Sequence, residues 1–435
     1  MQNTNLLQNN TSYKKFSHLV LVGSILLLML LLAVRDLRGV GFNKFIIVGI
    51  VAITCVLINF GDLLAYATFL IPLSSGIPGN FCFLALAIVY LLKKGTFDSG
   101  KVFIPLFFII QEVFLTFFAV GFNITNLMTY CINLAFVYLV ILDENDKRID
   151  YKKTLWTYLI GTLFMLAIIF FIAVKNSSFL EVVSGEKRIG YAEENTSGLV
   201  FGTNANTVGF YALMGISIAL YMISEGYKFR LFTFLAIGIC LFVGVLSVSR
   251  SFIIFLVLLL VIFAIKTFKP KFTQVLKLLA FIAFFTILVV VIINNTKILD
   301  AYIERFQGED LEGANGRLDI MIDYFKWQIV RPLRFFFGTG TVSYVATAGF
   351  KMASHNGTHQ ILICYGLIGF VVMIGSLIHA FKLSKGKKKL TILQAFPLLA
   401  FVCFVQTVQF LNPQEYFMSL IIIFFAIRAR KIKSE

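Results

Sequence analysis

The residues best suited to chemistry in this sequence lie in a polar segment at positions 315–370, between long apolar runs. Arg317 opens an amphipathic stretch there, and His355 and Asn356 come just before the next apolar run. A guanidinium engages phosphate oxygens through two parallel N–H donors. Imidazole accepts or donates a proton near neutral pH. These residue types therefore suggest an anionic partner together with general acid or base chemistry.

A second arginine, Arg250, lies in the short turn 247–251, which separates two apolar runs and contains three serines. An arginine at the edge of a membrane is costly unless it is paired or faces a watery cavity. One interpretation is a side chain that reaches the lipid headgroups. The other is an arginine that contacts a ligand, which the serine neighbours favour.

His355 and His359 are four residues apart, a spacing that would place them on one face of a helix. A histidine pair can bind metal, but zinc needs further ligands, and the glutamate of a His-Glu-x-x-His motif is missing here. We therefore expect no metal. His355 remains either a structural residue at the membrane boundary or a general acid or base.

The composition indicates an integral membrane protein, with 59% hydrophobic and 14% charged residues. We expect an all-α polytopic fold with about 12–14 transmembrane helices, and one long extracytoplasmic loop that contains a short amphipathic helix. The predicted spans are 17–34, 42–60, 63–76, 79–92, 102–121, 126–142, 154–174, 200–224, 231–248, 251–266, 276–294, 358–381, 391–410 and 416–428. The six cysteines lack Cys-x-x-Cys spacing and are predicted to be core residues rather than disulfides or metal ligands.

The distribution of basic residues predicts the orientation of the chain in the membrane. If residue 1 is cytoplasmic, the lysine and arginine clusters at 266–271, 385–389 and 428–433 all fall on the cytoplasmic side. The formal net charge of +16 then comes from these short basic clusters next to the anionic lipids of the cytoplasmic face. We therefore expect no nucleic-acid partner.

This orientation divides the chain into three parts. Residues 1–294 form transmembrane helices with an outer loop at 175–199, residues 295–357 form an extracytoplasmic catalytic loop, and residues 358–435 form C-terminal transmembrane helices with a basic cytoplasmic tail. The predicted location is the cell membrane, with the active site on the extracytoplasmic side.

The amphipathic stretch at 317–330 predicts a surface helix, with Asn315 as its N-cap and Pro332 marking its end. Arg317 would then lie in the first turn, where a positive charge opposes the helix dipole. Such a position hints at an anionic partner.

The order of these motifs resembles the O-antigen ligase and polymerase family. The match rests on Gly316-Arg317-Leu318, Gly338-Thr339-Gly340 and His355-Asn356, on Ser249-Arg250-Ser251 as a counterpart of that family's Ser-Arg-Gly element, and on Arg188-Ile189-Gly190 with Asn204-Ala205-Asn206 as a counterpart of its Gly…Asn-Pro-Asn segment. The resemblance covers residues 188–370. Ser251, Ala205 and the segment 357–359 depart from the family pattern.

The resemblance implies a membrane glycosyltransferase that takes a glycan from undecaprenyl diphosphate at the outer leaflet and transfers it to an acceptor hydroxyl. It implies no nucleotide sugar, no metal and no cofactor. Arg250 and Arg317 would stabilise the diphosphate leaving group, His355 would lie nearest the acceptor hydroxyl, and Asn356 would orient His355 or the sugar. Further candidates for substrate binding are Arg188, Asn206, Arg331 and His359.

The motifs leave the acceptor open. Richness in Phe, Ile, Lys and Asn favours a polymerase that builds O-antigen, capsule or exopolysaccharide chains, with a flippase and a chain-length regulator as further partners besides the lipid bilayer. The alternatives are ligase-type transfer to another acceptor, or a lipid-linked oligosaccharide flippase. Transporters often contain internal repeats, and none is evident here. The pair Gln111-Glu112 is the feature that most favours a transporter, although we favour a hydrogen-bonded structural glutamate over that interpretation.

Overall fold

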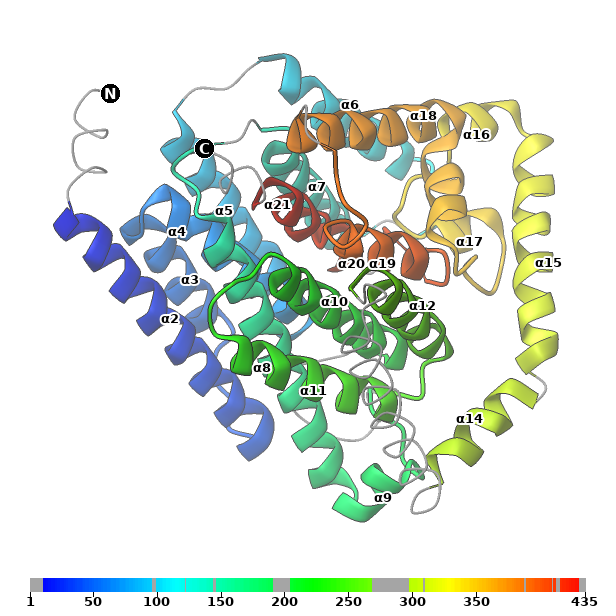
Figure 1. The fold of residues 1–435 in the computed structure, drawn as a ribbon. Helices are drawn as coiled ribbons and strands as arrows, with labels where there is room; N and C mark the ends of the chain where they lie inside the picture. The colour runs from blue at the N-terminus through cyan, green and yellow to red at the C-terminus, as the bar shows by residue number, and fades with distance from the viewer. Residues whose placement is uncertain are drawn as a thin grey trace. The chain divides into compact units, whose positions relative to one another are not determined.

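The computed structural model describes residues 11–95, 99–121, 123–143, 146–190, 204–267, 297–307, 310–386, 389–408, 410–411 and 415–429. Within these ranges, side chains are described except at 99, 267, 304–307, 310–317 and 415. Every regular element in the described part of the chain is a helix (Figure 1). The predicted all-α fold is therefore confirmed.

The chain divides into two compact units, which we describe separately. Unit 1 comprises 1–161, 316–389 and 405–435, and unit 2 comprises 162–315 and 390–404. The helices of unit 1 are α2 (Thr11–Arg38), α3 (Phe45–Leu57), α4 (Phe60–Leu70), η1 (Ile71–Gly76), α5 (Gly79–Lys94), α6 (Ser99–Thr116), α7 (Ile124–Ile141), the first part of α8 (Tyr151–Asn176), most of α15 (Asp310–Ile329), α16 (Pro332–Phe337), α17 (Tyr344–Ala348), α18 (Gly357–Lys385), α20 (Glu415–Met418) and α21 (Leu420–Ala429). Unit 2 contains the rest of α8, with α9 (Phe179–Ser184), α10 (Ala205–Ser224), α11 (Arg230–Leu246), α12 (Arg250–Thr267), α14 (Ile298–Gln307) and α19 (Phe396–Val405).

Polar side chains link the apolar helices of unit 1. Ser24 and Tyr66 hydroxyls lie 2.7 Å apart between α2 and α4, and Thr68 of α4 lies 2.9 Å from Thr157 of α8. Where helices are surrounded by lipid, such hydrogen bonds and close packing replace the hydrophobic driving force. They therefore define how the first helices of this unit associate.

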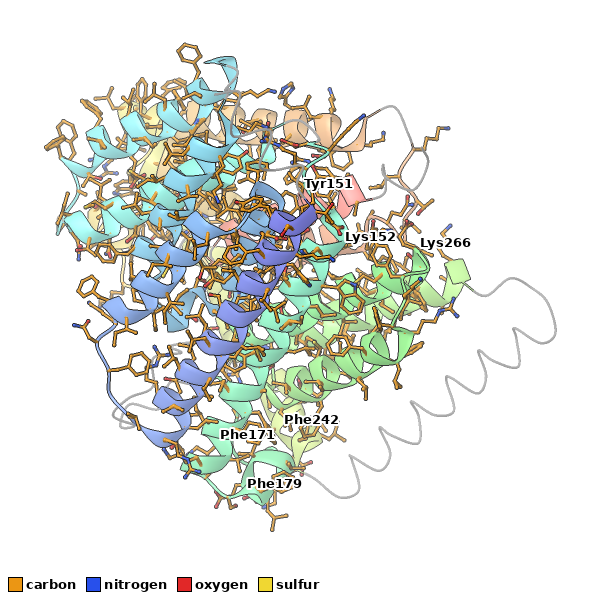
Figure 2. All side chains as sticks on the ribbon, turned by 90° about the vertical axis from the view of Figure 1, so that its left-hand side faces the viewer. Tyr151, Lys152, Phe171, Phe179, Phe242 and Lys266 are labelled. Atoms are coloured by element: carbon orange, nitrogen blue, oxygen red, sulfur yellow. The ribbon has the colours of Figure 1, made fainter. Side chains whose placement is uncertain are left out.

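Aromatic packing is prominent in unit 2. Phe170 of α8 lies 6.3 Å from Phe179 and 5.5 Å from Phe242 of α11, measured between ring centroids. Figure 2 shows Phe171, Phe179 and Phe242 at the same end of this unit. The phenylalanine-rich sequence thus forms contacts between α8, α9 and α11.

Five helices are long and apolar enough to cross a membrane, namely α2, α7, α8, α10 and α18. They coincide with the predicted spans at 17–34, 126–142, 154–174, 200–224 and 358–381. Shorter apolar helices of 10–17 residues account for several other predicted spans. The span predicted at 276–294 lies outside the described residues. The protein is a multi-pass helical membrane protein, and the total of 12–14 spans stays a prediction.

The predicted amphipathic helix exists, but it begins earlier than expected. Helix α15 begins at Asp310 and ends at Ile329, before Pro332. Asn315 is therefore inside the helix rather than its N-cap, and Arg317 lies beyond the first turn. The argument from the helix dipole does not apply to Arg317, because that effect is confined to the terminal turns.

Helix α18 is interrupted at Gly366, whose φ of 64° and ψ of −172° are not helical. Carbonyl groups just before this break accept hydrogen bonds from outside the helix. The amide of Thr339 donates to the carbonyls of Ile363 at 3.0 Å and Cys364 at 3.1 Å, and the amide of Gly340 donates to Cys364 at 2.8 Å. The segment that contains Gly338-Thr339-Gly340 therefore satisfies backbone groups that a continuous helix would satisfy internally.

This contact requires glycine on both sides. A Cβ atom on Gly338 would lie 2.2 Å from the Cys364 carbonyl oxygen, and one on Gly366 would lie 2.4 Å from the Phe336 backbone. Only a residue without a side chain allows two backbones to approach this closely.

Gln111 of α6 satisfies a further carbonyl at the break. Its Nε2 donates to the carbonyl of Tyr365 at 2.9 Å and to that of Phe337, the last residue of α16, at 2.7 Å. One amide group therefore ties α6 to both α16 and α18.

Gln328 of α15 forms a second bridge of the same kind. Its Nε2 donates to the carbonyls of Leu362 in α18 and Arg334 in α16, each at 2.9 Å. Gln328 is fully buried, as expected for a side chain whose main role is to satisfy backbone carbonyls.

We predict that Gly366→Ala destabilises the protein by more than about 2 kcal/mol, because it adds left-handed backbone strain to a clash with Phe336. The measurement is the apparent melting temperature of detergent-solubilised protein, followed by fluorescence-detected size-exclusion chromatography after heating. The matched control is Gly375→Ala in the same helix, where an added Cβ meets nothing within 4 Å. Equal melting temperatures for both variants would contradict the role of the break.

Candidate functional site

Two groups of predicted site residues lie in the two units. In unit 2, Arg188 follows α9 and its Nε donates to the carbonyl of Ser247 at 2.6 Å. The next residue, Ile189, donates its amide to the carbonyl of Leu246 at 3.3 Å. These hydrogen bonds hold the segment at 188–190 against the turn that precedes Arg250.

The asparagine segment joins the same turn. Asn204 is the N-cap of α10, where its Oδ1 accepts from the amide of Thr207 at 2.9 Å. Asn206, in the first turn of α10, accepts from the Ser249 hydroxyl at 3.2 Å. Three stretches that are far apart in sequence, at 188–190, 204–206 and 247–251, thus converge within one unit.

Arg250 is the first residue of α12 and directly follows this turn. Ser247 and Ser249 are completely buried, and Val248 between them has a left-handed φ of 48°. Arg250 itself is half-buried. Ser247 and Ser249 are therefore buried parts of the turn itself. Arg250 follows the turn as the first residue of α12.

In unit 1, His355 and Asn356 form the junction between a loop and α18. Asn356 is the N-cap, and its Oδ1 accepts from the amide of His359 at 2.9 Å. Its Nδ2 donates to the carbonyl of Gln406 at 3.2 Å. His355 precedes the cap with a left-handed φ of 40° and is half-buried. Asn356 thus fixes the direction in which the chain enters α18.

His359 lies in the first turn of α18, whereas His355 lies outside the helix, so the two are not on one helical face. His359 is 9% exposed, and neither of its ring nitrogens has a hydrogen-bond partner. Its ring packs edge-on against Tyr324, with centroids 6.2 Å apart. The surroundings of His359 are those of a packed core side chain.

Tyr324 of α15 organises the loop that leads to His355. Its hydroxyl donates to the carbonyl of Met352 at 3.1 Å, and its ring lies 4.1 Å from Phe350. Burial raises the pKa of the Tyr324 phenol, which keeps it protonated and able to donate. This loop is therefore held against α15 a few residues before the candidate base.

Two further predicted site residues, Arg317 and Arg331, also belong to unit 1. Arg317 lies in α15, and its side chain is outside the described atoms. Arg331 is exposed, and its guanidinium lies 4.9 Å from the Trp327 ring and donates to the Trp327 carbonyl at 2.8 Å. Among the described residues, no three His, Cys, Asp or Glu side chains are grouped as a metal site would require.

Glu112 is a buried hydrogen-bond acceptor in unit 1. It is completely buried in α6, and its Oε1 accepts from the amide and hydroxyl of Thr341, at 2.7 and 2.5 Å, and from the amide of Val342 at 3.2 Å. These bonds confirm the hydrogen-bonded interpretation of Glu112. Gln328 was not singled out from the sequence, and Gln111 was noted only as part of the pair Gln111-Glu112, without its role in bonding backbone carbonyls. Amide side chains next to or within apolar stretches are a usable signal of buried hydrogen bonding.

We predict that Glu112→Ala releases the segment at 338–342, because three donors lose their buried acceptor, at a cost of about 1–3 kcal/mol for each donor left unsatisfied. Limited proteolysis of the purified protein measures the release as faster cleavage between α16 and α17. Glu112→Gln keeps one acceptor oxygen and is the control, with cleavage close to that of the unaltered protein. If the Ala variant is cleaved no faster than the Gln variant, Glu112 does not hold this segment.

Comparison with known proteins tests the resemblance directly. Residues 235–374 match the family model described as O-Antigen ligase. No curated protein matches the chain. The matched region contains Arg250, Arg317, His355 and Asn356, together with the glycine segment and the break in α18. The family resemblance of the motifs is thereby confirmed: residues 235–374 of this multi-pass helical membrane protein are similar to the O-antigen ligase family.

Proposed function

We propose that this protein is a polysaccharide polymerase that transfers undecaprenyl-diphosphate-linked repeat units at the outer face of the cytoplasmic membrane. The observation that carries this proposal is the family match, because it includes all three residues to which we assign chemistry, Arg250, Arg317 and His355. The convergence of 188–190, 204–206 and 247–251 in unit 2 adds independent support, since it gathers the remaining motif residues next to Arg250.

The proposed reaction needs a leaving group that can carry charge. The acceptor hydroxyl oxygen forms a bond to the anomeric carbon of the donor, and the bond from that carbon to the phosphate oxygen breaks. The negative charge then stays on the lipid diphosphate. Arg250 and Arg317 stabilise it, because a guanidinium pairs with two phosphate oxygens at once.

The proton of the acceptor hydroxyl passes to His355. A residue held at a loop-to-helix junction suits this role, because Asn356 caps α18 and Tyr324 holds the preceding loop. Asn356 is then a positioning residue. The burial of His359 leads us to leave it out of the mechanism.

Polymerase and ligase activities differ in the acceptor. A polymerase adds a growing chain to another lipid-linked repeat unit, so a defective variant accumulates single lipid-linked units. A ligase variant would instead accumulate lipid-linked polymer that is not transferred. A flippase variant would leave single units on the cytoplasmic side. The identity and side of the accumulated intermediate therefore distinguish the three functions.

For the arginines, we predict that Arg250→Lys and Arg317→Lys each reduce polymer strongly while the protein inserts in the membrane at normal levels. Lysine keeps the charge but engages phosphate as a single point. Gel electrophoresis of extracted polysaccharide measures polymer length and yield. Arg148→Lys is the matched control, because Arg148 pairs with Asp146 away from the motifs. Polymer of normal length and yield from both site variants would remove the diphosphate role.

For the candidate base, we predict that His355→Ala lowers the transfer rate about 10²–10⁴-fold, as expected for loss of a general acid–base group. Single lipid-linked units should accumulate, as measured by mass spectrometry of extracted lipids. His355→Gln still forms hydrogen bonds but accepts no proton at neutral pH, so substantial activity in this variant would rule out the base role. His359→Leu, at a buried position, is the control with near-normal activity.

A further inference from the structure

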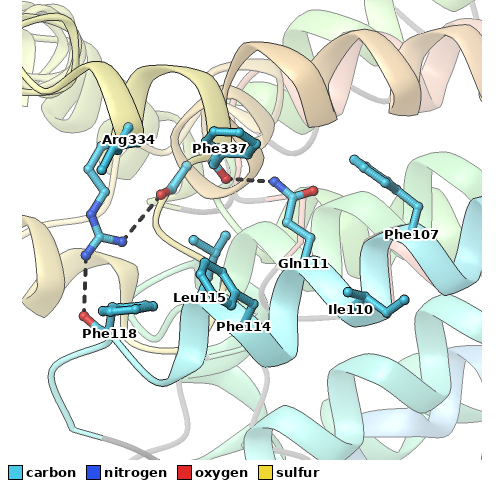
Figure 3. Close-up of a pocket in the computed structure, with 10 residues that line it drawn as sticks. Phe107, Ile110, Gln111, Phe114, Leu115, Phe118, Arg334 and Phe337 are labelled. Atoms are coloured by element: carbon cyan, nitrogen blue, oxygen red, sulfur yellow. Dashed lines mark hydrogen bonds between the residues drawn. The ribbon is translucent and has the colours of Figure 1, made fainter.

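An apolar groove lies between α6 and α16 in unit 1, outside the residues assigned to glycan transfer. Its volume is about 630 Å³, within the range of ~300–1,000 Å³ that ligand pockets occupy. The lining residues are Phe107, Ile110, Gln111, Phe114, Leu115, Phe118, Leu333, Arg334, Phe337 and Gly338 (Figure 3).

The walls of the groove are suited to a hydrocarbon chain. Phe114 is 59% exposed and Leu333 is 77% exposed, so the groove opens to the surroundings of the protein. Helix α6 falls in a predicted membrane span, where those surroundings are lipid rather than water. A concave apolar surface of this kind accepts an acyl chain from the bilayer.

Arg334 supplies the one charged side chain of the groove. It lies at the Phe118 end, where Nη2 reaches the Phe118 carbonyl and Nη1 reaches the Gly338 carbonyl, each at 3.4 Å (Figure 3). Both distances are longer than a good N–H to oxygen bond. No carboxylate pairs with Arg334 in the described part of the chain, and burial lowers the pKa of its guanidinium. A cation in this setting gains from an anionic partner, and a phosphate matches its geometry.

The charged and apolar parts are arranged as in a membrane lipid. Phe118 follows the C-terminal end of α6, which the predicted orientation places at the extracytoplasmic boundary. Phe107 and Ile110 are further back along α6, toward the middle of the span. A lipid with its phosphate at Arg334 and its chain along α6 therefore has the orientation of an outer-leaflet lipid.

We propose that this groove binds one anionic phospholipid of the outer leaflet, with an acyl chain between α6 and α16 and its phosphate on Arg334. The site is separate from the proposed glycan transfer and does not depend on it. Because Gln111 and Phe337 line the groove and also form the bridge at the α18 break, bound lipid stabilises that bridge.

The experiment places a tryptophan in the groove. Phe114→Trp is made in a protein whose two native tryptophans are removed as Trp156→Phe and Trp327→Phe, and it is reconstituted in nanodiscs of zwitterionic phospholipid. A small fraction of either phosphatidylglycerol or phosphatidylcholine with brominated acyl chains is included, because bromine quenches nearby tryptophan. The control is Leu26→Trp in the same background, at an exposed position on α2.

We expect phosphatidylglycerol to quench Trp at position 114 about threefold more effectively than phosphatidylcholine, the preference expected of a partly exposed ion pair. Adding Arg334→Gln should abolish the preference, and position 26 should show none. Equal quenching by both lipids at position 114, or a preference that survives Arg334→Gln, overturns the proposal. Loss of quenching when equimolar unlabelled polyprenyl phosphate is added also overturns it, in favour of a carrier-lipid site.

Native mass spectrometry of the unaltered chain supplies a second measurement without tryptophan replacement. The wild-type protein should retain phosphatidylglycerol in preference to phosphatidylcholine, and Arg334→Gln should lose that preference. Retention that is identical in the two proteins overturns the proposal even if the tryptophan variant fails to fold.

Discussion

The structure of unit 1 depends on backbone carbonyls that a broken helix exposes within an apolar environment. A carbonyl without a partner in such surroundings costs several kcal/mol. Helix α18 breaks at Gly366, and the carbonyls from Leu362 to Tyr365 all have donors from other elements. The placement of α6, α15 and the segment at 338–340 follows from the need to supply those donors.

This constraint gives the glycine motif a physical meaning. Gly338 and Gly366 lie where two backbones meet, and no other residue fits there without displacing one of them. Glu112 adds further hydrogen bonds to this segment, because it accepts from the backbone amides of Thr341 and Val342 just after the motif. The segment between α16 and α17 is therefore rigidly attached to α6 and α18. The candidate base, His355, lies next to the N-terminal end of α18. The hydrogen bonds at the Gly366 break and the proposed proton transfer therefore involve the same helix.

The arginines of the molecule differ in what surrounds them. Arg188 is fastened to the turn before α12, and Arg331 stacks on Trp327, so both have good contacts within the protein. Within the described part of the chain, Arg334 has two long bonds to carbonyls and no carboxylate partner. An arginine with few good hydrogen bonds or ion pairs inside the protein is expected to bind an anion, because a charge close to the membrane core is costly without a partner. This contrast separates a lipid-binding arginine from those that serve the fold.

Much of the fold class followed from the sequence, because apolar runs of membrane length leave the backbone few alternatives to helix. The resemblance to the O-antigen ligase family was also evident from the motifs, and the match of residues 235–374 to that family's model confirms the resemblance. The predicted end of α15 before Pro332 was right, but its predicted start was wrong, because the polar residues at 310–316 extend the helix and Asn315 is not its N-cap. The spacing of His355 and His359 would place them on one face only within a single helix, and they do not share a face because Asn356 caps α18 between them.

The sequence by itself determined that this protein is a helical membrane protein with arginine, histidine and glycine motifs in a given order, because hydropathy and motif spacing are local properties of the chain. Only the tertiary structure decided that Gln111, Gln328 and the glycine segment converge on one break in α18, and that Arg334 lies at the end of an apolar groove. These arrangements join residues that are far apart in sequence: the separation is 34 positions for the bond from Gln328 to Leu362 and 226 for the bond from Gln111 to Phe337. Which residues become hydrogen-bond partners across such sequence separations depends on how the helices pack. That packing cannot be predicted from the local sequence pattern.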